Sequence, residues 1–134
     1  MENEKADTGV RGFNVDSDGN LLVTIQALFR AWVVTPQGEV RSFGARGSTP
    51  GKFNIIGGIT RDEAGNIYVA DILRSVVMVF APDFRFIREF GYRGRSANSL
   101  AAPDELTIGN GRLYVANNAR RGVSVFKVTQ GEKD

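Results

Sequence analysis

Oxygen-bearing side chains are the main chemical resource of this 134-residue chain, because it contains no histidine and no cysteine. The absence of histidine removes the usual general base and the usual zinc or copper ligand. The absence of cysteine excludes disulfides and iron–sulfur clusters. Carboxylate and amide oxygens remain as ligands for calcium. The candidates are Asp16, Asp62, Asp71, Asp104, Glu105, Asn117 and Asn118.

A structural role competes with metal binding for these oxygens. Asp16 and Asp62 each precede a turn that contains glycine, where short polar side chains bond local backbone N–H groups. We therefore expect no metal, no other cofactor and no catalytic residue, and we interpret the chain as non-enzymatic.

Arginine supplies a second kind of chemistry, since 13 of the 17 basic residues are arginine. If the loops that follow the second and fourth strands of each repeat share a face, that face would be positive and suited to phosphate. Tyr92 would then be available for base stacking in RNA. Against this, the formal net charge is only +2, and scattered arginines usually form a solvated surface. The candidate phosphate-binding residues are Arg46, Arg93, Arg95, Arg120 and Arg121.

The elements that must position these residues form a repeat. The phrase DGNLLVT recurs as AGNIYVA and as NGRLYVA, and the glycines of the three copies, Gly19, Gly65 and Gly111, are 46 residues apart. A period of this length is typical of solenoids, propellers and arrays.

Each repeat reads as four short strands. In the middle repeat the β-branched and aromatic runs cover residues 59–61, 67–71, 76–80 and 86–90, with turns at Gly65 and Pro82 between them. No segment keeps helical periodicity without meeting glycine or proline. We predict an all-β fold of about eleven antiparallel strands, a partial β-propeller of three blades.

One propeller segment is expected over residues 1–134. Blade 1 covers about 10–53, blade 2 about 54–100 and blade 3 about 101–128, and blade 3 lacks its outer strand. Three blades cannot close a ring, since propellers usually have about four to eight. Open end sheets would lose burial worth on the order of ten kcal/mol per end. A dimer of half-rings, a larger assembly or missing further blades would each cover them.

The repeat resembles the NHL repeat, whose blades run close to P-x-G-I-x-x-D-x-x-G-N-I-Y-V-A-D, followed by R-V-Q-V-F and F-G. The middle unit carries the fullest match, and the first and third units match in part. The resemblance implies a propeller that commonly has six blades, and it places a bracing carboxylate at Asp71. Some proteins with this repeat bind RNA, and lactonase-like propellers bind calcium, so the resemblance implies both as possible activities. Lyases with the same propeller use zinc bound by histidine, and this chain has no histidine. The matching residues of the middle unit are Gly58-Ile59, Asp62, Gly65–Asp71, Val79-Phe80 and Phe90-Gly91.

Two bends, each after the second strand of its repeat, depart from this pattern. They carry the apolar residues Leu28-Phe29 and Ile72-Leu73 where polar turn residues are usual. Exposed contiguous apolar groups mark interaction surfaces. Trp32 and Met78 occupy matching positions nearby, and packing between blades is the alternative for both. The candidate partner-binding residues are Leu28, Phe29, Trp32, Ile72, Leu73 and Met78.

The sequence thus favours a protein-interaction or scaffolding module, part of a homodimeric ring or a larger assembly, with a protein partner or a second copy bound. RNA binding is the alternative, and a calcium-dependent lactonase-like hydrolase is third. No run approaches a membrane span, and the polar residues 1–7 show no signal peptide, so we expect a cytoplasmic or mature exported protein and leave the compartment unassigned.

Overall fold

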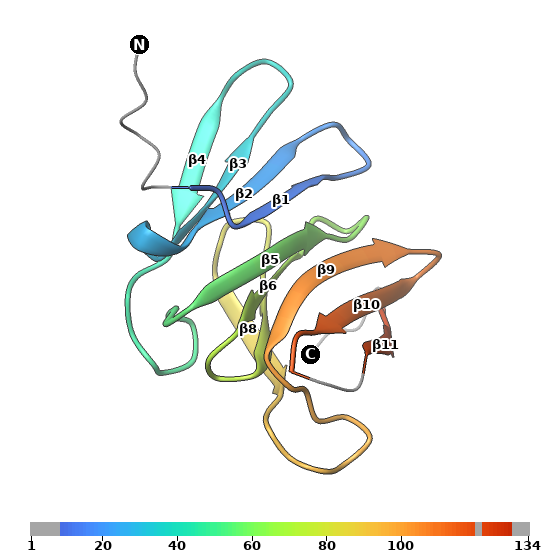
Figure 1. The fold of residues 1–134 in the computed structure, drawn as a ribbon. Helices are drawn as coiled ribbons and strands as arrows, with labels where there is room; N and C mark the ends of the chain where they lie inside the picture. The colour runs from blue at the N-terminus through green and yellow to red at the C-terminus, as the bar shows by residue number, and fades with distance from the viewer. Residues whose placement is uncertain (1–8, 120–121, 130–134) are drawn as a thin grey trace.

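The computed structural model describes residues 9–119 and 122–129, and it confirms the all-β prediction (Figure 1). Within these ranges eleven strands form three antiparallel sheets, with a short 3-10 turn at Gln26–Leu28. The first sheet contains β1 (Gly12–Val15), β2 (Leu21–Ile25), β3 (Arg30–Val34) and β4 (Val40–Phe43), in chain order. The second contains β5 (Ile56–Arg61), β6 (Ile67–Asp71), β7 (Val76–Phe80) and β8 (Phe86–Gly91). The third contains β9 (Pro103–Gly109), β10 (Arg112–Asn117) and β11 (Val123–Lys127).

The three sheets stand side by side in an arc, with the second between the first and the third (Figure 1). The first strand of each sheet lies on the inside, and β5 contacts both β1 and β9. Two hydrophobic clusters fill the spaces between the sheets. One joins the first and second sheets around Leu22, Ile59 and Met78, and the other joins the second and third around Tyr68, Val79 and Leu113.

Burial along the strands follows the position of each sheet in the arc. Every residue of β6 and β7 is buried, because the middle sheet is covered on both faces. In β2, β3, β10 and β11 exposure alternates along the strand instead. Successive residues of a strand point to opposite faces. The described residues therefore cover the first and third sheets on one face each.

The repeat makes residues 46 apart in the second and third strands of each sheet equivalent. Val23, Val69 and Val115 illustrate this, since they pair with Phe13, Ile59 and Leu106 of the inner strands. The three sheets thus give three copies of each position, which can be compared one by one.

Among the described residues, no helix is both long and apolar enough for a transmembrane segment.

Candidate functional site

The outer face of the first sheet is an apolar surface exposed to solvent. Phe13 is 66% exposed and Val15 is 59% exposed, and the half-buried Trp32 lies in the same cross-strand row as Phe13. At the position equivalent to Phe13, Ile59 of the middle sheet is 1% exposed because the first sheet covers it. We call this surface the first end face; it comprises Phe13, Val15, Leu21, Val23, Ile25, Arg30, Trp32 and Val34.

The outer face of the third sheet is also open. Val123 and Val125 are 60% and 53% exposed, whereas their equivalents Val77 and Val79 in the middle sheet are fully or almost fully buried. We call this surface the third end face; it comprises Glu105, Thr107, Tyr114, Ala116, Val123 and Val125.

The two apolar bends lie at one edge of the arc, and their residues differ in burial. Leu28 and Leu73 are exposed, whereas Phe29 and Ile72 are half-buried. Phe29 has a left-handed backbone with φ 56°, and the equivalent Ser75 has φ 57°. The bends keep the same backbone geometry although their side chains differ.

Met78 requires a correction. Its side chain is 0% exposed in the cluster between the first and second sheets, so within this chain it cannot take part in a surface for a partner. Trp32, at the equivalent position, is half-buried on the first end face. The physical reason is that the first sheet packs over Met78, whereas no described sheet packs over Trp32.

The arginines expected to bind phosphate lie beside the apolar bends. The Arg46 guanidinium lies 5.3 Å from the centre of the Phe29 ring, and Arg93 Nη2 donates to the Leu73 carbonyl at 2.9 Å. The loops after the second and fourth strands therefore do share a face. Arg95 is exposed in the same loop as Arg93, and Arg120 and Arg121 lie outside the described residues.

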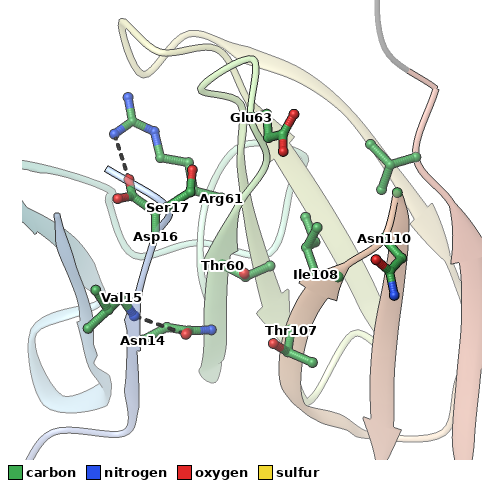
Figure 2. A pocket seen from close by; sticks show the side chains of 13 residues that line it. Asn14, Val15, Asp16, Ser17, Thr60, Arg61, Glu63, Thr107, Ile108 and Asn110 are labelled. Atoms are coloured by element: carbon green, nitrogen blue, oxygen red, sulfur yellow. Dashed lines mark hydrogen bonds and ion pairs between the residues drawn. The ribbon is translucent and has the colours of Figure 1, made fainter. Parts of the chain in front are cut away.

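A polar pocket of about 300 Å³ lies at the opposite edge, where the inner strands end (Figure 2). Asn14, Thr60 and Thr107, from β1, β5 and β9, line it together with the turns that follow these strands. Asn14 Nδ2 donates to the carbonyls of Ile59 at 3.1 Å and Leu106 at 3.3 Å, which ties all three inner strands together.

An ion pair closes one wall of this pocket. Arg61 Nη1 lies 3.1 Å from Asp16 Oδ2 and so joins the first and second sheets (Figure 2). Burial opposes ionisation of Asp16, but hydrogen bonds from Asn20, Asp18 and Arg61 outweigh it and hold the pKa of Asp16 below its ordinary value. The carboxylate is thus already committed to protein partners.

The other oxygen-bearing candidates are likewise engaged by the protein. Asp62 accepts hydrogen bonds from the Asn66 N–H at 2.9 Å and the Tyr68 hydroxyl at 3.0 Å. Asp104 and Glu105 pair with Arg11. Asn118 is the exception, because it is exposed and the bond it makes, to the Ala102 carbonyl, comes from its backbone N–H. In the described part of the chain, no group of three or more carboxylates is arranged to hold a metal ion.

Asp71 and Asn117 act as equivalent clamps on the segments that lead into their sheets. Asp71 accepts from the N–H groups of Asn54 at 2.7 Å and Ile55 at 3.3 Å, and Asn117 Oδ1 accepts from the Ala101 N–H at 3.0 Å. The bracing role that the NHL resemblance assigns to Asp71 agrees with these contacts. In the first sheet Ile25 takes the position, and an apolar residue can make no such clamp.

The sequence reasoning missed the residues that dominate the end faces. These residues alternate with polar or buried neighbours, as in any strand that is covered on one face, so the local pattern does not mark them: Phe13, Val15, Val123 and Val125. The available signal was the repeat itself, because it identifies Ile59, Val77 and Val79 as the equivalents of Phe13, Val123 and Val125.

No model of a known protein family matches the chain, and no curated protein sequence matches it. Solved structures do match it. Virginiamycin B lyase from Staphylococcus aureus is 13% identical with a TM-score of 0.58, over 98% of this chain and 44% of the lyase. The calcium-binding protein regucalcin from Agrobacterium tumefaciens is 16% identical with a TM-score of 0.61, over 87% of this chain and 44% of regucalcin.

Hydrazine synthase from Kuenenia stuttgartiensis is 16% identical with a TM-score of 0.68, over 90% of this chain and 33% of the matched chain. All three matches are to β-propeller proteins, and this chain spans less than half of each. At such low identity the likeness concerns the fold alone. The chain therefore has the β-propeller fold, of which it forms an arc of three blades.

Proposed function

We propose that this protein is a non-enzymatic interaction or scaffolding module of NHL-repeat type, whose two end faces dock onto protein. The observation that carries the proposal is the contrast between equivalent positions. Phe13 is 66% exposed where Ile59 is 1% exposed, and Val123 is 60% exposed where Val77 is 0% exposed. Apolar sheet faces of this kind mark interaction sites.

Two kinds of assembly can cover the end faces: a regular ring of two half-rings, or one in which each end face meets a different surface. Two details favour the second. Gly58 packs directly on the backbone of the next sheet, since a Cβ there would lie 2.8 Å from Glu105 Cα. Gly12 is equally confined, with the Gly57 carbonyl 2.8 Å from such a Cβ. The third sheet carries Glu105 at this position, so its side chain opposes the same packing by a fourth sheet.

The second detail is the tie that Asn14 makes to Leu106, at 3.3 Å. Half of a six-bladed ring would hold the inner strands of its first and third blades apart across a central channel. Here the Asn14 side chain bridges β1 and β9, which supports an arc tighter than a half-ring.

The mass of the particle in solution tests the proposal. Light scattering should give a mass above the 14.6 kDa of one chain, and twice that value for a dimer. Phe13→Ser and Val123→Ser should each lower the mass, because each removes apolar area from one end face. Ile87→Ser is the matched control, since Ile87 is an exposed residue of β8 outside both faces. A folded 14.6 kDa particle whose stability is independent of concentration would contradict the proposal.

RNA binding is a second candidate, supported by the face that Arg46, Arg93 and Arg95 share. Retention on immobilised RNA should fall steeply with salt if these residues contact phosphate. Arg95→Gln should reduce it without a change in stability, because Arg95 is exposed. Retention that is indifferent to salt would exclude this candidate.

A further inference from the structure

Among the residues that the structure describes, the third sheet has three strands, whereas the first and second sheets each have four. In those sheets β3 pairs with β4 and β7 pairs with β8. The equivalent strand of the third sheet, β11, pairs only with β10 among the described residues and forms the sheet edge. An edge strand of this kind presents unpaired backbone groups that can accept another strand.

The direction of the backbone groups of β11 follows from two hydrogen bonds at its ends. The Gly122 carbonyl accepts from Asn117 and the Val128 N–H donates to Gly111, so the even-numbered residues of the strand bond to β10. Backbone groups alternate in direction along a strand. The N–H and C=O groups of Val123, Val125 and Lys127 therefore point outward.

The complete sheets show what such groups bind. The Ala81 N–H donates to Arg85 and the Thr35 N–H donates to Glu39, so odd-numbered residues of β7 and β3 bond to the outer strands. Val77 pairs with Phe90 there, and Ala31 pairs with Phe43. Val123 is the third member of this set, so an added strand would place an aromatic residue opposite it.

The other face of β11 also shows an incomplete contact. Phe126 is half-buried, and its ring lies 5.0 Å from that of Phe90. Its equivalent Phe80 is buried and has Phe86 of β8 opposite it, with ring centres 5.7 Å apart. An added strand with an apolar residue opposite Phe126 would complete the same pair.

We propose that β11 accepts an extended peptide from a partner protein as an antiparallel fourth strand. The peptide carries an apolar residue opposite Phe126 and an aromatic residue opposite Val123, in the pattern of β8. Both complete sheets end this strand with Phe-Gly, and their glycines Gly44 and Gly91 have φ of 123° and 119°, so a glycine should follow the aromatic residue. The edge offers outward backbone groups of β11, whereas the third end face offers side chains, including those of Val123 and Val125 from the same strand. The peptide test below can fail while the mass measurement succeeds.

A labelled peptide with the sequence of residues 83–92, which contains β8, is a suitable probe. Fluorescence anisotropy should show saturable binding to the intact chain. N-methylation of the peptide at the residue copied from Phe90 should abolish binding, because that N–H faces β11. N-methylation at the residue copied from Glu89 should have little effect, since that N–H points away.

The chain itself offers a matched pair of variants. Val125→Pro removes an outward N–H and leaves the bonds to β10 in place, because proline is tolerated where the N–H faces away from the sheet. It should weaken peptide binding by at least about tenfold. Val125→Thr keeps the N–H and should bind within about twofold of the parent. Thermal unfolding of both variants checks that the sheet remains folded.

Several outcomes would overturn the proposal. One is the absence of peptide binding, and another is binding that survives both Val125→Pro and the N-methyl group at the Phe90 position. A dimer of the chain alone that Val125→Pro dissolves and Val125→Thr leaves intact would show that a second copy occupies the edge instead. Loss of binding in the two blocked forms, with retention in the two controls, would establish β11 as the binding edge.

Discussion

The two ends of the arc are both open, but they differ in what they could receive (Figure 1). The first end face is equivalent to the face of the middle sheet that the first sheet covers, with Phe13 at the position of Ile59 and Trp32 at the position of Met78. Its inner strand has no obstructing side chain. The third end face has Glu105 where Gly12 and Gly58 give the other sheets their close contact. In the described part of the chain, β11 is also the edge strand of its sheet.

This difference shows that blade packing is decided at the inner strand. In the second and third strands, equivalent positions carry apolar residues of similar size whether or not a sheet covers them, since valine recurs at equivalent positions in all three sheets. The inner strand allows no such exchange, because neighbouring backbones approach too closely there for a Cβ. A fourth blade therefore requires a small residue at position 105 more than it requires further apolar area.

The largest effect should come from comparing Met78 with Trp32, which share a repeat position. Met78→Ala should reduce the free energy of unfolding by about 2–5 kcal/mol, because it leaves a cavity in the core between the first two sheets. Trp32→Ala should cost about 1 kcal/mol or less in the isolated chain, since Trp32 is only half-buried. Urea denaturation measures both.

The concentration dependence of the same measurement sharpens this comparison. If the first end face is covered in an assembly, Trp32→Ala should become costly at concentrations at which the assembly forms. Equal costs for the two variants at every concentration would contradict the view that the end faces differ from the core.

Gly58→Ala should have the next largest effect. A Cβ at Gly58 would lie 2.8 Å from Glu105 Cα and 2.9 Å from the Asp104 carbonyl oxygen, and these backbone atoms can move only if the third sheet shifts. We expect a loss of about 1–3 kcal/mol in the free energy of unfolding. Gly109→Ala is the matched control, because no atom lies within 4 Å of a Cβ there. A neutral Gly58→Ala would refute the close-packing argument.

Much of the fold was predictable because turn chemistry and strand composition agree in each repeat. The strands at residues 67–71 and 76–80 lie where the sequence placed them. The inner strand β5 begins at Ile56, earlier than the predicted Ile59, and its pairing is irregular between these residues. Gly57 and Gly58 stand there, and glycine has a low strand propensity. The sequence pattern therefore placed the start of this strand too late, after the two glycines that the close packing requires.

The interaction surfaces were less predictable, because burial depends on the neighbour of each sheet. Val77 and Val123 have the same residue type at the same repeat position, and only the presence of a further sheet makes one buried and the other exposed. The contacts between Phe29 and Arg46 also depend on tertiary structure, because the residues lie on different loops. Local patterns located both groups without showing that they meet.

High pH should affect the contact between the second and third sheets, where Tyr68 of β6 is buried, more than the third end face. Burial, followed by the charge and the hydrogen bond of Asp62, raises the pKa of the Tyr68 hydroxyl well above its ordinary value of 10.0. The neutral hydroxyl therefore stabilises the fold at a pH below the unfolded pKa of about 10, and this stability is lost as the pH rises above it. Denaturation at pH 8 and pH 11 should show the decline.

Tyr68→Phe should remove part of that decline and cost about 1 kcal/mol at pH 8, because it deletes the buried hydrogen bond to Asp62. Tyr114→Phe, at the equivalent position on the third end face, is the control. A decline of the same size in Tyr68→Phe would assign the pH effect to other groups.

The smallest effect on stability should come from Glu105→Gly, although it bears most directly on the two ends. The exposed pair with Arg11 contributes less than about 1 kcal/mol, and glycine in a strand costs a similar amount. The free energy of unfolding should therefore fall by about 1 kcal/mol or less at low protein concentration. The same change gives the third sheet the small residue that the first two possess, so self-association through β1 of a second copy should increase. Glu105→Ala separates the two contributions, because it also deletes the charge but leaves a Cβ that would still meet the backbone of a fourth sheet. Sedimentation that finds equal association in both variants would show that the charge of Glu105, and not its side-chain volume, keeps the third end face from closing on another blade.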